Sequence, residues 1–254
     1  MTEPLLSLRN LSKRFSGVVA VDDVSFDVAG GEVCGLIGPN GAGKTTVFNL
    51  IAGATPPSAG TIRFNSRDVT ALKSHDIARL GVARSFQRVA LFDSLTVHDN
   101  VLVAAEDHGR WRFWSAVTHL GGYQDRSRAA ALRARDALEL MGASALAGHR
   151  VESLSFGQQR LVGTARALAA GPRLLLLDEP AAGLSASELD SLRAAIARVR
   201  SAGTSILLVE HNVEFVMSVC DRVVAMNFGR KIAEGPADAV RQDPAVIEAY
   251  LGTR

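Results

Sequence analysis

The sequence predicts an α/β fold with a mostly parallel β-sheet at its core, a small antiparallel β-sheet at the N-terminal end and an inserted helical segment. Strand-like apolar runs alternate with helical patterns along much of the chain. Four consecutive leucines at 174–177 are typical of a strand covered on both faces. The stretch from about 89 to 154 is helical in pattern throughout.

The N-terminal part predicts two half-buried strands, because apolar and polar residues alternate at 6–8 and at 24–28. We expect these strands to pair as the small antiparallel sheet. A short apolar run at 32–37 then leads through a glycine-rich turn into the helix-prone segment 44–52. The order strand, loop and helix is typical of a βα unit in a parallel sheet.

Later segments continue this alternation. Alanine, leucine and charged residues, or apolar residues three and four positions apart, predict helices at 129–141, 161–168 and 189–199. Ser185 and Glu188 form a capping-box pattern before the third helix. The apolar run at 205–209 predicts another buried strand.

Composition excludes several functions. The 254 residues are 47% apolar, which is enough to fill a core. The formal net charge is only +2 and the basic residues are scattered, so we expect no nucleic-acid partner. Cys34 and Cys220 lie far apart without metal-ligand spacing, which predicts two buried free thiols in a reducing compartment. We see no targeting pattern and no run of about 18 apolar residues, so we expect a chain that is neither secreted nor membrane-spanning by itself.

The segment GPNGAGKTT fits the phosphate-loop pattern G-x-x-x-x-G-K-[ST]. Its glycines allow backbone N–H groups to turn toward phosphates, and the helix behind the loop favours an anion. Lys44 would bridge the β- and γ-phosphates, and the Thr45 hydroxyl would bind Mg²⁺. The alternative is a glycine-rich turn that matches by chance. The predicted nucleotide-binding residues of the loop are Gly38, Pro39, Asn40, Gly41, Ala42, Gly43, Lys44, Thr45 and Thr46.

A phosphate loop alone does not distinguish kinases, GTPases and motor ATPases. The segment LLLLDEP supplies acidic residues directly after the leucine-rich strand. Asp178 suits a carboxylate that organises Mg²⁺, and Glu179 suits a general base that polarises the attacking water. The alternative is a structural acidic cap at the end of a strand.

Between these motifs lies LSFGQQR, residues 154–160, which resembles the signature motif of ATP-binding-cassette (ABC) ATPases. Ser155 alone would be explained as a helix N-cap, with Gly157 leaving backbone N–H groups accessible. That alternative does not explain why the motifs occur together and in this order. The resemblance covers essentially the whole chain. It implies a P-loop NTPase (RecA-like) core and a single nucleotide-binding domain over 1–254, with the helical subdomain inserted at about 89–156.

The same resemblance implies further site residues. Phe15 stands where an aromatic residue stacks on adenine. Gln87 is similar to the loop glutamine that touches Mg²⁺ and the transporter channel, and His211 is similar to the switch histidine at the γ-phosphate. Taken alone, a phenylalanine is more often part of a core, and a histidine or glutamine is more often a surface or capping residue. The assignment rests on the order of the motifs along the chain.

In this family two subunits pair head to tail, as a homodimer or a heterodimer. The resemblance implies that Ser155, Gly157 and Gln158 of one subunit close over the γ-phosphate held by Lys44 of the other. ATP would then join the subunits, and hydrolysis would release them. The implied partners are two integral membrane permease subunits, with a solute-binding protein acting indirectly. The implied location is the cytoplasmic face of the membrane, as a peripheral subunit.

Finer features are similar to the ATP-binding subunits of branched-chain amino acid importers. These features are GVARSFQ at 81–87, the stretch at 91–104, Phe156 in place of the commoner glycine, PAAGL at 180–184 and VIEAYLG at 246–252. Importers of urea, short amides or other organic acids share most of them, so those cargoes stay open. Ser185 and Asn212 stand where many relatives carry Asp. The segment with Trp111 and Trp114 is interpreted as a packed loop of the helical subdomain, or alternatively as a contact for the membrane subunit.

Two other classes of function fit the sequence less well. A soluble ABC ATPase of repair or translation would need a long heptad-patterned insertion or two cassettes in tandem, and neither pattern occurs. An assembly-type ATPase is harder to separate, although the stretch around Gln87 favours an importer. A nucleotide-binding regulator without hydrolysis is not supported, because Glu179, His211 and Gln87 are all present.

Overall fold

The computed structural model describes residues 3–85, 91–106 and 123–251. Gln87 and the segment with Trp111 and Trp114 lie outside the described residues. The chain divides into two compact units, which are treated separately. The first comprises Met1–Arg84, Arg173–Ala182 and Arg200–Arg254, and the second comprises Ser85–Pro172 and Gly183–Val199.

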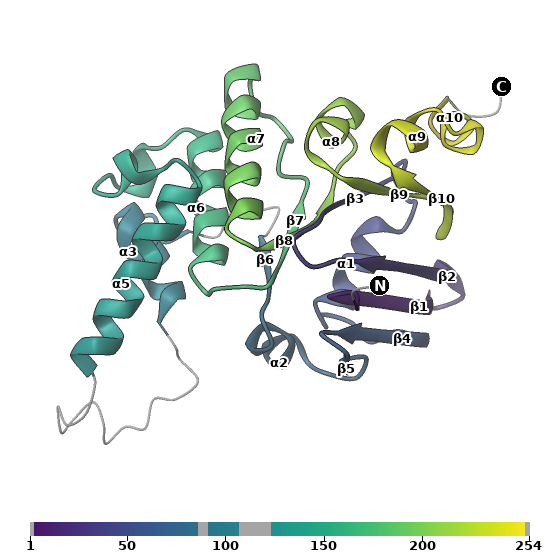
Figure 1. The fold of residues 1–254 in the computed structure, drawn as a ribbon, viewed down its shortest axis with the longest axis horizontal. Coiled ribbons are helices and arrows are strands. Elements are labelled where there is room, and N and C mark those ends of the chain that lie inside the picture. Colours follow the sequence, from purple (N-terminus) through teal and green to yellow (C-terminus); the bar gives the residue numbers. More distant parts are fainter. Residues whose placement is uncertain (1–2, 86–90, 107–122, 252–254) are drawn as a thin grey trace. The chain divides into compact units, whose positions relative to one another are not determined.

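The first unit contains a four-stranded antiparallel sheet in the order β2-β1-β4-β5 (Figure 1). Its strands are β1 Leu6–Phe15, β2 Val18–Val28, β4 Ala59–Phe64 and β5 Arg67–Asp68. The predicted N-terminal antiparallel pair is therefore confirmed, and both strands are longer than the apolar alternation indicated. Ser16 and Gly17 join β1 to β2 with φ of 42° and 96°, the paired positive values that suit a tight hairpin.

A six-stranded sheet in the order β10-β9-β3-β8-β7-β6 forms the mostly parallel core. β3 pairs in parallel with β8 and β9, and β7 pairs in parallel with β8, whereas β10 is antiparallel to β9. All residues of β3, β7 and β8 are buried, as the uninterrupted apolar runs predict. The strands are β3 Val33–Ile37, β6 Val82–Ser85, β7 Leu174–Asp178, β8 Ser205–Val209, β9 Arg222–Asn227 and β10 Arg230–Pro236.

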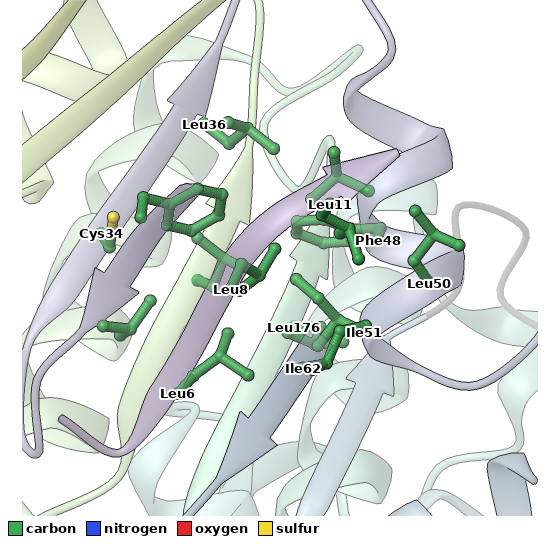
Figure 2. Close-up of a cluster of buried hydrophobic side chains, with 14 of the residues drawn as sticks. Leu6, Leu8, Leu11, Cys34, Leu36, Phe48, Leu50, Ile51, Ile62 and Leu176 are labelled. Carbon is green, nitrogen blue, oxygen red and sulfur yellow. The ribbon is translucent and has the colours of Figure 1, made fainter. Parts of the chain in front are cut away.

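One hydrophobic cluster joins both sheets to the helix behind the glycine-rich loop. Figure 2 shows Leu8 and Leu11 of the antiparallel sheet beside Leu36 and Leu176 of the parallel sheet and Phe48 of the helix. Burial of each such leucine contributes roughly 1.5–3 kcal/mol relative to an exposed one. The cluster therefore fixes β3 and the following helix, which carry the loop between them.

The two cysteines differ in their surroundings. Both are free thiols. Cys34 is buried in β3, and desolvation raises its pKa to about 12. Cys220 is only half-buried, so the expectation of two buried thiols is wrong for this residue. Cys220 is the C-cap residue of the helix Val213–Val219, which ends just before β9.

Helices complete both units, and the three helices predicted from the pattern are confirmed. The first unit holds α1 Lys44–Ile51, α2 Ser74–Arg79, α8 Val213–Val219, α9 Ala237–Arg241 and α10 Pro244–Leu251. The second holds α3 Val97–Ala105, α5 Tyr123–Leu140, α6 Phe156–Leu168 and most of α7 Ala186–Ser201, with 3-10 turns at Ser144–Leu146 and Val151–Ser153. α3, α5 and α6 pack against one another (Figure 1). Among the described residues, no helix is long and apolar enough to cross a membrane.

Candidate functional site

The glycine-rich loop begins where β3 ends and leads into α1. Its backbone requires glycine, because Gly38, Gly41 and Gly43 have φ of 150°, 81° and 96°. A Cβ on Gly38 would lie 2.2 Å from the carbonyl oxygen of Met226, and one on Gly43 would lie 2.4 Å from that of Ala20. The loop is therefore a close-packed backbone cradle at the start of a helix, which is the geometry that binds phosphate.

Lys44 places its ammonium group within this loop. It is only 6% exposed, and its Nζ donates hydrogen bonds to the carbonyl oxygens of Gly38 at 2.7 Å and Pro39 at 2.9 Å. Burial lowers its pKa, while the charges of Glu179 and Asp178 oppose that effect. A cation held between backbone oxygens and two acidic side chains is suited to receive a polyphosphate.

Asp178 ends β7, and its carboxylate is almost completely buried. The guanidinium of Arg84 donates to its Oδ2 at 2.6 Å and to the side chain of Asn49 at 2.7 Å. Arg84 also lies over the ring of Phe48, 5.8 Å from its centroid. Sequence reasoning used Arg84 only as a family marker. No strand was predicted at 82–85, and no local pattern there indicated a partner for Arg84.

Glu179 follows directly and has a backbone conformation that is uncommon for a side-chain-bearing residue, with φ of 49°. His211 lies after β8, and its Nδ1 is 3.6 Å from Oε1 of Glu179. The two residues are thus neighbours in space although 32 positions separate them in sequence. This distance is too long for a good hydrogen bond, so the two side chains are close neighbours and not a directly bonded pair.

Four other predicted residues of the first unit are exposed or half-buried. Thr45 and Asn40 are exposed, and Thr46 is half-buried in the first turn of α1. Phe15 ends β1 with 46% of its surface exposed, and the Lys13 ammonium lies 4.9 Å from its ring centroid. An exposed ring with a cation on it retains a free surface on which a flat ring can stack.

The predicted signature residues lie in the second unit. Ser155 caps α6 in a full capping box: its Oγ accepts from the N–H of Gln158 at 3.2 Å, and Gln158 Oε1 accepts from the N–H of Ser155 at 2.9 Å. A Cβ on Gly157 would lie 2.1 Å from Oε1 of Glu188, so a larger residue there would require the Glu188 side chain to move. The Ser185 hydroxyl donates to the other oxygen of Glu188 at 2.8 Å. One carboxylate thus faces both Ser185 and the N-terminus of α6.

Comparison with known proteins decides the family. Residues 21–182 match the sequence model of the family described as ABC transporter. The chain belongs to the ABC transporter family. The model described as "Branched-chain amino acid ATP-binding cassette transporter" matches residues 230–254. The match over residues 21–182 contains the glycine-rich loop, Asp178 and the N-terminus of α6.

Full-length relatives agree with that assignment. The cassette is 41% identical over 99% of both chains to the high-affinity branched-chain amino acid transport ATP-binding protein BraF of Pseudomonas aeruginosa. It is 40% identical, with the same coverage, to the LivG protein of the same description from Escherichia coli K12. Among solved structures, the ADP conformation of the ABC transporter cassette MJ1267 has a TM-score of 0.85 and is 29% identical, covering 99% of this chain and 100% of that one.

The ABC cassette is therefore an ATP-binding enzyme that hydrolyses ATP. Sequence reasoning missed two residues that contact parts of the predicted site. The Tyr250 hydroxyl of α10 accepts a hydrogen bond from the N–H of Gly38 at 2.9 Å. Glu210, between β8 and His211, is completely buried. The sequence signals were an acidic residue at the end of an apolar strand and a tyrosine in the last helix.

Proposed function

We propose that this cassette powers an importer of branched-chain amino acids. The observation that carries the proposal is the similarity to BraF along 99% of both chains, together with the family model that matches residues 230–254. In this proposal the cargo contacts other subunits of the importer, and this chain supplies the energy.

The side chains divide the work of hydrolysis. Lys44 would exchange its contacts with the Gly38 and Pro39 carbonyls for the β- and γ-phosphate oxygens, which are better acceptors for an ammonium group. Glu179 would act as general base on the attacking water, and His211 would contact the γ-phosphate from the neighbouring loop. Their separation of 3.6 Å supports this proposal, because side chains so close together could contact the same γ-phosphate and its attacking water.

The donor set also fits Mg²⁺. Asp178 offers a carboxylate and Thr45 a hydroxyl, the hard oxygen ligands that Mg²⁺ prefers. Among the described residues, no cluster of three or more acidic, histidine or cysteine side chains could hold a metal ion. Mg²⁺ bound there would neutralise charge between the β- and γ-phosphates. Gln87 is proposed as a further ligand on the family resemblance alone.

The proposal includes partner subunits. Two cassettes, identical or related, would pair head to tail so that Ser155, Gly157 and Gln158 of one close the site of the other. Ser155 is exposed at the N-terminus of α6. This position supports the proposed role, because the backbone N–H groups at a helix N-terminus suit a phosphate oxygen. The pair would bind two membrane permease subunits at the cytoplasmic face, with a solute-binding protein outside. That residues 1–254 act as one nucleotide-binding domain, with a helical subdomain at about 89–156, remains a prediction.

Uptake by whole cells tests the cargo. A strain lacking this chain should lose uptake of radiolabelled leucine, and expression of the wild-type chain should restore it. Radiolabelled urea serves as the second substrate, because urea importers are the nearest alternative. Restoration of urea uptake with unchanged leucine uptake would contradict the proposed cargo while leaving the ATPase assignment intact.

A further inference from the structure

Glu210 is a completely buried acidic residue outside the motifs that assign the site. It follows the last residue of β8 and directly precedes His211. Burying a carboxyl group is unfavourable unless its oxygens have hydrogen-bond partners. The identity of those partners therefore shows which segments of the chain Glu210 connects.

Backbone N–H groups from two different loops supply the partners. Oε1 accepts a hydrogen bond from the N–H of Ala181 at 2.6 Å, and Oε2 accepts one from the N–H of His211 at 3.2 Å. The N–H of Asn212 also stabilises the carboxylate. One side chain thus connects the loop after Glu179 with the loop that carries His211.

A second connection lies one residue earlier. The N–H of Glu179 donates to the carbonyl oxygen of Val209 at 2.9 Å, which extends the pairing of β7 with β8 by one step. Between the two connections the chain must turn, and Glu179 adopts its positive φ of 49° there. Such conformations persist only where surrounding contacts fix them. Val209 and Glu210 supply contacts on both sides of that turn.

We propose that Glu210 is a positioning residue that holds Glu179 and His211 in their relative places for ATP hydrolysis. The proposal rests on the roles proposed above for those two residues. Glu210 itself touches neither water nor nucleotide in this role, because it is fully enclosed. It acts through the backbone, and its loss would let the two loops shift independently.

Two substitutions at Glu210 distinguish the effect of side-chain length from the effect of charge. Glu210→Asp keeps the charge but shortens the side chain by one methylene, so it can still serve its own loop but no longer reaches Ala181. Glu210→Gln keeps the length but presents an amide NH₂ where an acceptor is needed. Exposed Glu214, in the first turn of α8, provides the matched control Glu214→Gln.

The experiment measures steady-state ATP hydrolysis and equilibrium ATP binding on the full-length chain. Misplacement of catalytic groups by about 1 Å can reduce turnover on the order of 100-fold, so we expect kcat to fall roughly 10- to 100-fold in both variants. The Kd for ATP should stay within about twofold, because the glycine loop and Lys44 are untouched. Hydrogen exchange at the Ala181 amide should become faster, and the control should match the wild type.

Two results would overturn the proposal. One is a kcat that stays near the wild-type value in Glu210→Asp, since the connection to Ala181 would then be dispensable. The other is an equal loss of kcat and ATP affinity, which would indicate general damage to the fold. If Glu210→Gln does not fold, Glu210→Asp decides. Glu179→Gln is run in parallel: normal turnover in that variant would refute the proposed role of Glu179 rather than the role of Glu210.

Discussion

The guanidinium of Arg84 forms a 2.6 Å ion pair with the carboxylate of Asp178, and both side chains are largely buried. Arg84 comes from β6, which the sequence analysis did not assign to the site. This pair offsets the cost of a buried negative charge at the end of β7. The Arg84 guanidinium therefore holds the Asp178 carboxylate in place.

Removing one partner of this pair should destabilise the fold. We expect Arg84→Met to lower the free energy of unfolding by about 3–5 kcal/mol, because the Asp178 charge would remain buried without a partner. Urea denaturation measures the change. The exposed pair of Arg193 and Asp190 supplies the control, since Arg193→Met should cost no more than about 1 kcal/mol. Equal losses of unfolding free energy in the two variants would show that burial does not increase the contribution of the Arg84 pair to stability.

Glu179→Gln tests the general base. The amide cannot accept a proton from water, so we expect kcat to fall roughly 10²–10⁴-fold while ATP still binds. Steady-state hydrolysis and ATP titration on the same preparation give both values. Unchanged turnover would remove Glu179 from the role proposed for it.

Lys44→Ala should weaken ATP binding. Charge-assisted hydrogen bonds contribute about 1.5–3 kcal/mol, so we expect ATP affinity to fall roughly 10- to 100-fold. ATP titration of the variant measures the loss. Lys73→Ala, which removes an exposed lysine just before α2, should leave the affinity unchanged. A comparable loss in both variants would point to net charge rather than to the position of Lys44 in the loop.

Tyr250→Phe tests the contact between α10 and the phosphate loop. The phenylalanine ring keeps the packing but leaves the Gly38 N–H without its acceptor. We expect the free energy of unfolding to fall by about 0.5–1.5 kcal/mol. Thermal or urea unfolding checks the stability, and hydrogen exchange at the Gly38 amide should accelerate. Slow exchange at Gly38 in the variant would mean that this N–H does not depend on the tyrosine.

The sequence predicted those features that local pattern determines. The leucine run at 174–177 predicted a buried parallel strand, and the glycine spacing predicted the phosphate loop, because each depends on a few adjacent residues. The turn at Ser16 and Gly17 was missed, although serine followed by glycine is a known turn signal. The strands it joins were therefore expected to be shorter than they are.

The supporting residues of the site could not be predicted in the same way. Arg84, Glu210 and Tyr250 contact partners that lie 94, 29 and 212 positions away along the chain. No local spacing indicates such partners, since only the order of strands in the sheet brings them together. The sequence therefore predicted which residues handle ATP, and the structure adds which residues contact them.

Transport by purified protein tests the central claim most directly. The complete transporter, containing this chain, would be placed in lipid vesicles with ATP and Mg²⁺ supplied on the side of the cassettes, and accumulation of radiolabelled leucine would be followed. We predict ATP-dependent accumulation with the wild-type chain and none with Glu179→Gln, although that variant still binds ATP. Equal accumulation with both chains, or accumulation without ATP, would contradict the claim that hydrolysis at this site powers import.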